Sequence, residues 1–155
     1  MDANQRRAIE WDCAQNTIRF YNRLDAVRGE EAAAIFAEDG IWYKQGEDTG
    51  HTGREEIAAF VNSLPDRGNK AIPRELRMVI HMVLNLEVDV LSEDEAEVRA
   101  LTVVIPGARG VDKTQEGWTY GISATFPTVE RHKRTPEGWK IASKRTSLAM
   151  RVKRD

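Results

Sequence analysis

Cysteine is nearly absent from this chain of 155 residues, because Cys13 is the only one. An internal disulfide is therefore excluded, and we expect the protein to work in a reducing compartment such as the cytoplasm. The sequence also has no apolar run long enough to cross a membrane and no apolar leader pattern, so we expect neither a membrane span nor a secretory signal. Cys13 itself falls on the apolar side of a predicted helix, where it should fill the core.

Charge of one sign and metal-binding patterns are lacking as well. The net charge is −2, so no basic excess favours nucleic acid as a partner. No residues have convincing metal-ligand spacing, and no glycine-rich phosphate loop follows a predicted strand. We therefore expect neither a metal nor another cofactor. What remains is the composition of a soluble globular protein, with 41% hydrophobic and 31% charged residues, and its length fits one domain over residues 1–155.

The first helix is predicted from Asn4 to Val27. One row of residues at helical spacing should be buried, and an adjoining row should widen the buried face. The first row is Ile9, Cys13, Thr17, Phe20 and Leu24, and the second is Trp11, Ala14, Ile18 and Tyr21. Asp25 lies on the apolar side in the last turn, where the helix dipole disfavours an anion. Either a partner holds this carboxylate, or the helix ends early and Asp25 sits in a wet loop.

Two shorter helices should follow the first one. One is predicted from Glu30 to Phe36, and it precedes a turn at residues 38–40 and a short strand from Ile41 to Tyr43. Thr52 and Glu55 have the spacing of a capping box, in which the threonine hydroxyl and the glutamate side chain each accept a backbone hydrogen bond. This pair should open a helix that Pro65 ends.

The second half of the chain is rich in Val, Ile, Thr and aromatic residues and predicts four strands. They run over Met78 to Leu91, Ala96 to Ile105, Trp118 to His132 and Trp139 to Met150. The short turns within the first and last pairs indicate an antiparallel meander. Helices first and a sheet afterwards give an α+β fold, with the helices on one face of a curled sheet. Strands this long need a bulge to curve, and Asn85 is the expected place.

His81 interrupts the apolar residues of the first long strand. It shares one strand face with Val83, while Ile80, Met82 and Leu84 take the other, so we expect both faces to be covered. A lone histidine in such a strand is commonly a satisfied core residue. An imidazole with a pKa near neutrality is equally suited to act as a general base. The residues alone leave both interpretations open.

Four segments of the sequence together resemble a known family. They are FYNRLDAVRGEEAAAIFAEDGIWY, HTGREEIAAFV, the strand that carries His81, and EGWKIASKRTSL. In this order and spacing they resemble the SnoaL-like branch of the nuclear transport factor 2-like superfamily, over roughly Ile9 to Arg151. The resemblance implies a cone-shaped, curved antiparallel (mixed) sheet wrapped around the long N-terminal helix and two shorter helices. It also implies a pocket between helix and sheet, and a homodimer that pairs through the exposed sheet face.

In the dehydratase-like members of that superfamily, an aspartate on the first helix orients a histidine on the sheet. The matching positions here hold Asp25 and His81. The resemblance thus implies a cofactor-free lyase of dehydratase type, with His81 as base and Asp25 as the group that fixes its tautomer. The substrate would be a small hydrophobic, cyclic molecule. Two alternatives stay open: a non-catalytic ligand-binding module, and the small subunit of a ring-hydroxylating dioxygenase.

Further residues are candidates for contact with the substrate. They are Phe20, Tyr21, Trp42, Tyr43, Asn85 and Arg131. Phe20 stands where the dehydratase-like motif often has a tyrosine, and Tyr21 lies one place on. Arg131 matches an arginine of the dehydrochlorinase pocket, although an exposed ion pair with a glutamate on the next strand would also explain it. The remaining histidines, His51 and His132, are expected to face solvent.

Overall fold

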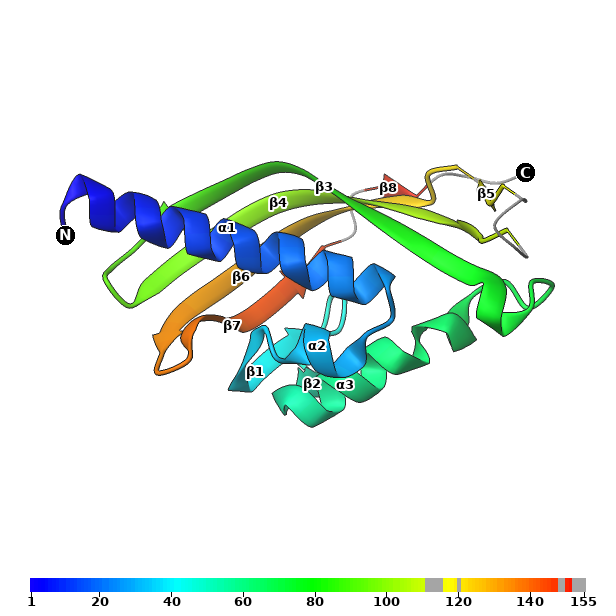
Figure 1. Ribbon diagram of the computed structural model, residues 1–155, viewed down its shortest axis with the longest axis horizontal. Coiled ribbons are helices and arrows are strands. Elements are labelled where there is room, and N and C mark those ends of the chain that lie inside the picture. The colour runs from blue at the N-terminus through cyan, green and yellow to red at the C-terminus, as the bar shows by residue number, and fades with distance from the viewer. Residues whose placement is uncertain (111–115, 120, 148–149, 152–155) are drawn as a thin grey trace.

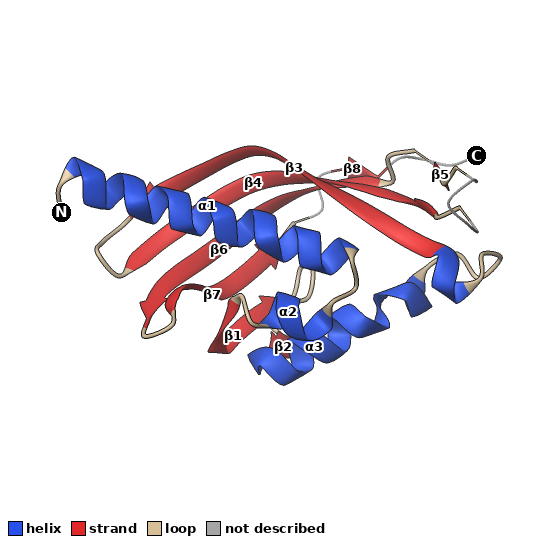
Figure 2. Cartoon of the chain, viewed as in Figure 1, coloured by secondary structure: helices blue, strands red, loops and turns tan. Residues whose placement is uncertain are grey.

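A computed structural model describes residues 1–110, 116–119, 121–147 and 150–151. Its main layer is an open curved sheet with the strand order β2-β1-β7-β6-β4-β3. The long helix α1 (Ala3–Asp25) lies across one face of this sheet, and the shorter helices α2 (Gly29–Ala33) and α3 (Gly53–Ser63) cover its β1–β2 end (Figures 1 and 2). The expected α+β architecture is therefore confirmed.

The sheet is mixed rather than purely antiparallel. Its strands are β1 (Phe36–Tyr43), β2 (Gly50–Thr52), β3 (Arg77–Val90), β4 (Glu95–Ala108), β5 (Trp118–Thr119), β6 (Ala124–Thr135), β7 (Gly138–Thr146) and β8 (Met150–Arg151). Strands β3, β4, β6 and β7 form the predicted antiparallel meander, and β1 joins β7 in parallel. Two 3₁₀ turns, Leu64–Arg67 and Arg74–Leu76, connect α3 to β3.

Helix α1 begins at a capping box that the sequence analysis did not identify. The Asp2 carboxylate accepts hydrogen bonds from the backbone N–H groups of Asn4 and Gln5, and the Gln5 side chain accepts from the Asp2 N–H. The first predicted row of the helix is buried throughout, as expected. In the second row Tyr21 is buried and Ala14 half-buried, but the prediction is wrong for Trp11, which is 66% exposed, and Ile18, which is 41% exposed. The sheet therefore covers a narrower face of the helix than the apolar pattern indicated.

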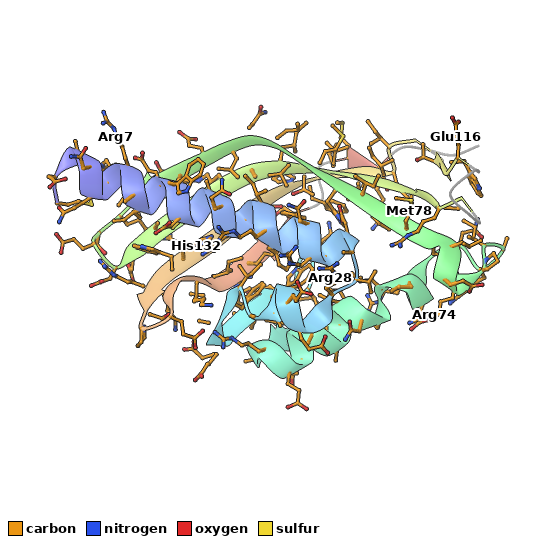
Figure 3. The ribbon with its side chains drawn as sticks, viewed as in Figure 1. Arg7, Arg28, Arg74, Met78, Glu116 and His132 are labelled. Carbon is orange, nitrogen blue, oxygen red and sulfur yellow. The ribbon has the colours of Figure 1, made fainter. Side chains whose placement is uncertain are left out.

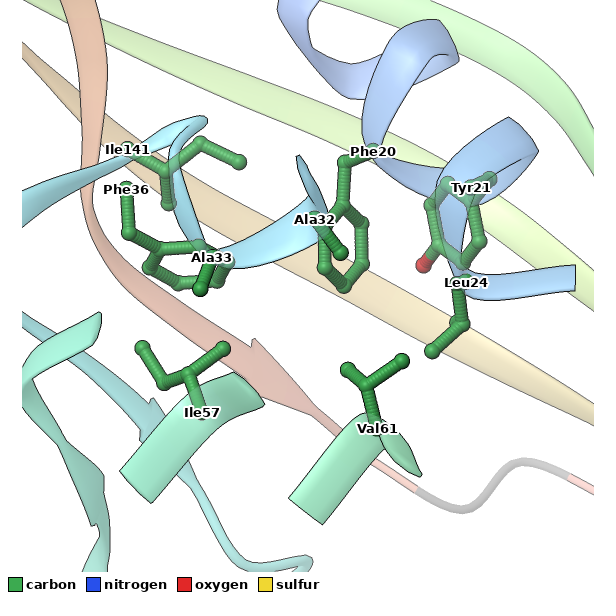
Figure 4. Packing of buried hydrophobic residues seen from close by; sticks show 9 residues of the cluster. All are labelled: Phe20, Tyr21, Leu24, Ala32, Ala33, Phe36, Ile57, Val61 and Ile141. Atoms are coloured by element: carbon green, nitrogen blue, oxygen red, sulfur yellow. The ribbon is translucent and has the colours of Figure 1, made fainter. Parts of the chain in front are cut away.

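Two clusters of buried side chains hold the helices on the sheet. The larger one joins the C-terminal half of α1 to α2, α3 and β7 (Figure 4). Its members are Phe20, Tyr21, Leu24, Ala32, Ala33, Phe36, Ile57, Val61 and Ile141. The second cluster lies under the N-terminal half of α1 and contains Ile9, Cys13, Val90, Ala96, Val98 and Trp139. Burial of this kind stabilises the fold by about 25 cal/mol for each Å² of apolar surface removed from water.

A bulge divides strand β3 at the place predicted for it. Asn85 has a positive φ of 51°, and the pairing of β3 with β4 shifts between Leu84 and Glu87. Asparagine tolerates this left-handed conformation better than most residues. Before the bulge, Ile80, Met82 and Leu84 are between 40% and 44% exposed. The expectation that both faces of this strand are covered is therefore wrong within one chain.

Several predicted boundaries differ from the structure. Helix α2 ends at Ala33, and β1 begins already at Phe36, whose side chain is needed in the core. The predicted turn at residues 38–40 is an irregularity within β1, where its pairing with β7 shifts. The Thr52 hydroxyl does not cap α3, and Glu56 rather than Glu55 accepts from the Thr52 N–H, at 2.8 Å.

The third and fourth predicted strands are each divided in two. The structure separates β5 from β6 and β7 from β8. Residues 111–115 of the predicted loop, and residues 120 and 148–149 of the predicted strands, lie outside the described residues. In the described part of the chain, no helix combines the length and apolar character needed to cross a membrane.

Candidate functional site

A cavity with two lobes lies beside the C-terminal end of α1. The first lobe has a volume of about 370 Å³ and the second about 330 Å³. The two share part of their walls, which identifies them as adjoining parts of one space. The shared residues are Leu24, Trp42, Phe60, Arg67, His81, Val104 and Phe126. A space of this size is typical of small-molecule sites.

Asp25 and His81 are in direct contact at the wall of this cavity. Asp25 is the last residue of α1, and its Oδ1 lies 2.5 Å from His81 Nδ1. Its other oxygen, Oδ2, accepts a hydrogen bond of 2.8 Å from the backbone N–H of His81. Asp25 therefore belongs to the helix rather than to a wet loop. The two contacts hold the carboxylate in one orientation against β3. Their stabilisation of the charge outweighs the unfavourable helix dipole.

This contact determines which imidazole nitrogen can act on a ligand. In the neutral ring the proton sits on Nδ1, because only an N–H can donate to the Asp25 carboxylate. Nε2 is then the acceptor, and it has no hydrogen-bond partner among the residues that the structure describes. His81 lines both lobes and its side chain is 17% exposed, so an imidazole with an unoccupied acceptor nitrogen borders the cavity.

Three of the other candidate residues also line the cavity. Trp42 lines both lobes, and Tyr43 lines the second, with Arg145 stacked 3.4 Å from the centre of its ring. Tyr21 lines the second lobe, and its ring lies 5.5 Å from that of His81. Its hydroxyl, however, already contacts Lys144 at 2.8 Å and other buried groups. Tyr21 thus supplies a wall of the cavity rather than a free hydroxyl.

The remaining candidates do not reach the cavity. Phe20 is completely buried in the larger core cluster (Figure 4). Its ring packs edge-on against Phe36 and Trp42. Asn85 is exposed and serves the bulge. Arg131 is 54% exposed and pairs with Glu97 on β4 at 2.7 Å. The expectation that these three residues contact a substrate is therefore corrected by their positions.

A buried ion pair beside the cavity was missed by the sequence analysis. Lys144 on β7 donates to Glu130 Oε1 on β6 at 2.5 Å, and both side chains are almost fully buried. The second oxygen of Glu130 accepts from the Thr17 hydroxyl at 2.6 Å and lies 3.2 Å from His132 Nε2. His132 is only 1% exposed, so the expectation that it faces solvent is wrong.

The charges of this pair stabilise each other. Burial alone would raise the pKa of Glu130, but attraction to Lys144 and a hydrogen bond from His132 outweigh it and lower the pKa to about 2. Burial would lower the pKa of Lys144, and the neighbouring Glu130 instead raises it. Both groups are therefore charged at neutral pH. The sequence offers no local signal for them, because Thr128, Glu130 and His132 alternate with Val129, Arg131 and Lys133, and this alternation does not show which face is buried.

His51 is also placed differently from the expectation. It is half-buried and stacks on the Phe60 ring, with ring centres 4.2 Å apart and planes inclined by 20°. It lines the second lobe of the cavity. Within the described residues, no three His, Cys, Asp or Glu side chains come together in a way that could hold a metal ion.

Comparison with solved structures defines the class of fold. A Novosphingobium aromaticivorans protein, described as nuclear transport factor 2-like with a cystatin-like fold, is 20% identical with a TM-score of 0.70, covering 94% of this chain and 86% of its own. A second protein from that organism, provisionally named as a scytalone dehydratase, is 20% identical with a TM-score of 0.70, covering 97% and 91%. A Catenulispora acidiphila protein in complex with S-DNPA is 21% identical with a TM-score of 0.67, covering 88% and 90%.

The sequence comparison identifies the family within this class. The family model described as a SnoaL-like domain matches residues 5–145, so the chain belongs to the SnoaL-like family. No curated protein matches the chain. The resemblance found in the sequence is therefore confirmed for family and fold. At identities near 20%, the solved structures support the fold alone.

Proposed function

We propose that the protein is a cofactor-free enzyme of the lyase, dehydratase-like type, acting on a hydrophobic, cyclic molecule held in the cavity. The observation that carries this proposal is the contact of Asp25 with His81 Nδ1, which leaves Nε2 available beside an open cavity. A ligand-binding module without chemistry would not need a histidine whose tautomer is fixed in this way. His81 is the proposed base and Asp25 the residue that orients it.

The proposed step is an elimination of water. Nε2 of His81 takes a proton from a carbon atom that an electron-withdrawing group has made acidic. The electron pair of that C–H bond forms a double bond to the neighbouring carbon, and the bond from this carbon to its hydroxyl group breaks. The imidazolium returns its proton to the departing hydroxide, so that water leaves and His81 is neutral again. Asp25 stabilises the imidazolium while it exists.

The walls of the cavity favour this chemistry. Met78, Val79, Val104 and Phe126 line the first lobe with apolar side chains. An apolar wall strengthens the interaction between Asp25 and an imidazolium, because less water screens the two charges. Trp42 offers a flat apolar surface for a ring, and Tyr43 a polar edge in the second lobe. These features support a substrate with a hydrophobic ring.

The proposal is tested with a His81→Ala variant and a panel of cyclic β-hydroxy ketones in deuterated water. NMR measures exchange of the acidic C–H proton and formation of the unsaturated product. His81→Ala should lower the rate by about 10²–10⁴-fold, the usual contribution of a general base. Arg131→Gln is the control, because Arg131 is exposed and outside the cavity. If wild-type protein binds panel members without exchange or water loss, the ligand-binding module is favoured instead.

We also propose that two copies pair through the outer face of the sheet. Ile80, Met82 and Leu84 on β3 are exposed there, and Leu101 and Ile105 pair with this strand on the same face. Such a contiguous apolar surface is unusual on a monomer and suits a symmetric interface.

Light scattering after size exclusion tests this arrangement. The wild-type protein should have twice the mass of one chain, and the Met82→Glu variant should have the mass of a single chain. Leu91→Glu is the control, since Leu91 is exposed but lies after the end of β3. A stable dimer would argue against the dioxygenase-subunit alternative, and a monomeric wild type would exclude the pairing.

A further inference from the structure

The cavity is lined by more positive than negative charge. Of the described residues that line it, Asp25 is the only one with a carboxylate, and His81 holds both of its oxygens. Three cationic side chains line the two lobes in addition to Lys144, whose charge Glu130 balances. They are Lys44, Arg67 and Arg77. The lining therefore has an excess of positive charge before any ligand is bound.

Arg67 is central to this excess. It lines both lobes, and its guanidinium carbon lies 4.7 Å from the centre of the Phe60 ring. Among the described residues it forms no ion pair, because the adjacent Asp66 binds Arg74 at 2.6 Å. Stacking on an aromatic ring holds the flat guanidinium in place while its N–H groups remain free to donate. Arg67 is thus held in place by Phe60 and can donate hydrogen bonds to a ligand in the cavity.

Lys44 lines the second lobe, which Arg67 also lines. The nearby acidic side chains are engaged elsewhere, since Glu47 accepts from the Thr49 hydroxyl and Asp48 pairs with Arg145. No ion pair of Lys44 occurs within the part of the chain that the structure describes.

His51 reports the combined field of these cations. Its pKa is lowered first by burial and then by the positive charges of Lys44 and Arg67, which outweigh the opposing effect of Glu56. Both cations are therefore close enough to influence one point of the cavity wall.

Arg77 adds a positive charge to the first lobe. Its Nε donates to the backbone carbonyl of Ile72 at 2.8 Å, and its Nη1 donates to that of Pro65 at 2.9 Å. These partners are uncharged, so they position the guanidinium without neutralising it. The positive charge of the first lobe therefore comes from Arg67 and Arg77 together.

We propose that the natural ligand carries an anionic group, which Arg67 and Lys44 bind beside Phe60, while its apolar body lies against the walls of the first lobe near His81. This rests on the function proposed above and narrows its substrate class to a hydrophobic acid. Charge-assisted hydrogen bonds from Arg and Lys recognise carboxylates and phosphates alike. The bound anion would complete the charge balance that the described residues leave open.

The test uses two fluorescent probes with closely similar aromatic skeletons. 8-Anilinonaphthalene-1-sulfonate carries a negative charge, and N-phenyl-1-naphthylamine carries none. Fluorescence titration of the full chain should give a tighter Kd for the sulfonate by about ten-fold, which one or two charge-assisted contacts supply. Arg67→Gln and Lys44→Gln should each weaken the sulfonate by about five-fold and leave the neutral probe within about two-fold.

Arg7→Gln is the matched control, because it removes one positive charge from the exposed face of α1 at the opposite end of the molecule from Arg74 and Met78 (Figure 3). It should change neither Kd. Circular dichroism and a thermal melt establish that each variant is folded. Equal affinity of wild-type protein for the two probes would overturn the proposal. An Arg67→Gln variant whose affinity falls equally for both probes would overturn it as well.

Competition identifies the anion. Decanoate, decyl phosphate and decanol are compared as displacers of the neutral probe. The two anions should displace it at lower concentration than the alcohol, and the stronger of them indicates whether the natural group is a carboxylate or a phosphate. Displacement by decanol at equal concentration would contradict the proposal. His81→Ala should retain the preference for the sulfonate, so the outcome for ligand class is independent of the outcome for catalysis.

Discussion

Removing the cation of the buried Glu130–Lys144 pair should destabilise the protein strongly. In Lys144→Met the ammonium is lost, and the Glu130 carboxylate stays buried with only the hydrogen bonds of Thr17 and His132. Breaking a buried pair in this way typically costs about 3–5 kcal/mol, because a charge is left without compensation. The fall of the Glu130 pKa from 4.5 to about 2 leads to a similar magnitude. At about 1.4 kcal/mol for each pKa unit, it corresponds to roughly 3 kcal/mol.

Urea unfolding at pH 7 measures this loss. With an m-value of about 2 kcal/mol/M, a loss of 3 kcal/mol lowers the midpoint by about 1.5 M. The double variant Glu130→Leu/Lys144→Met should recover at least half of the loss, since an apolar pair of similar size can replace a buried ion pair. A double variant whose loss equals the sum of the two single losses would refute this reasoning.

The pH dependence of the same pair has a definite sign. The folded-state pKa of Glu130 is lower than its unfolded value, so the stability it contributes is fully present above about pH 4.5. That contribution is lost as the pH falls toward about 2, where the folded carboxylate takes up its proton. The difference in unfolding free energy between wild type and Lys144→Met should therefore shrink between pH 7 and pH 3. A difference that stays constant over this range would contradict the assignment.

Three further variants or reagents test other parts of the structure. Asp25→Asn should lower turnover by about a hundred-fold or more in steady-state assays, because an amide can stabilise the wrong tautomer of His81; unchanged turnover would exclude its orienting role. Burial, with minor help from nearby acidic groups, raises the pKa of Cys13 to about 12, so a thiol reagent should react only after unfolding, and rapid reaction of native protein would disprove it. Asn85→Ala should cost about 1 kcal/mol in urea unfolding, whereas a neutral result would remove the strain argument.

Much of the fold could be predicted because its signals are periodic. The buried row of α1 follows from helical spacing, the strands of the second half follow from their composition although two of the four are divided, and Asn85 marked the bulge. The contact of Asp25 with His81 joins residues far apart in the sequence, and no local pattern indicates it. It was expected only because both residues occupy motif positions of a resembling family. The structure then supplied what the sequence lacked, namely the distance and the open cavity.

The parts that could not be predicted depend on partners across the fold. Glu130 and Lys144 look like ordinary solvent-facing charges, and only the pairing of β6 with β7 brings them together inside the core. Trp11 looks buried from its helical row, yet it is 66% exposed. In both cases the local sequence is consistent with either environment. Tertiary packing determines whether such a residue is buried or exposed, and no short stretch of the sequence predicts it.

The bulge at Asn85 has a consequence for how this protein can change. Only the part of β3 before it, Arg77 to His81, lines the cavity, whereas Val88 and Val90 after it pack into the closed core under the first half of α1. One strand thus borders the open cavity before the bulge and the closed core after it, and the bulge shifts the alternation of its side chains between the two parts. Substitutions at Met78 or Val79 should therefore change the shape of the cavity without touching the two buried clusters, to which neither residue belongs. Changes in the shape of the cavity and changes in the stability of the core can therefore arise at different positions of a single strand.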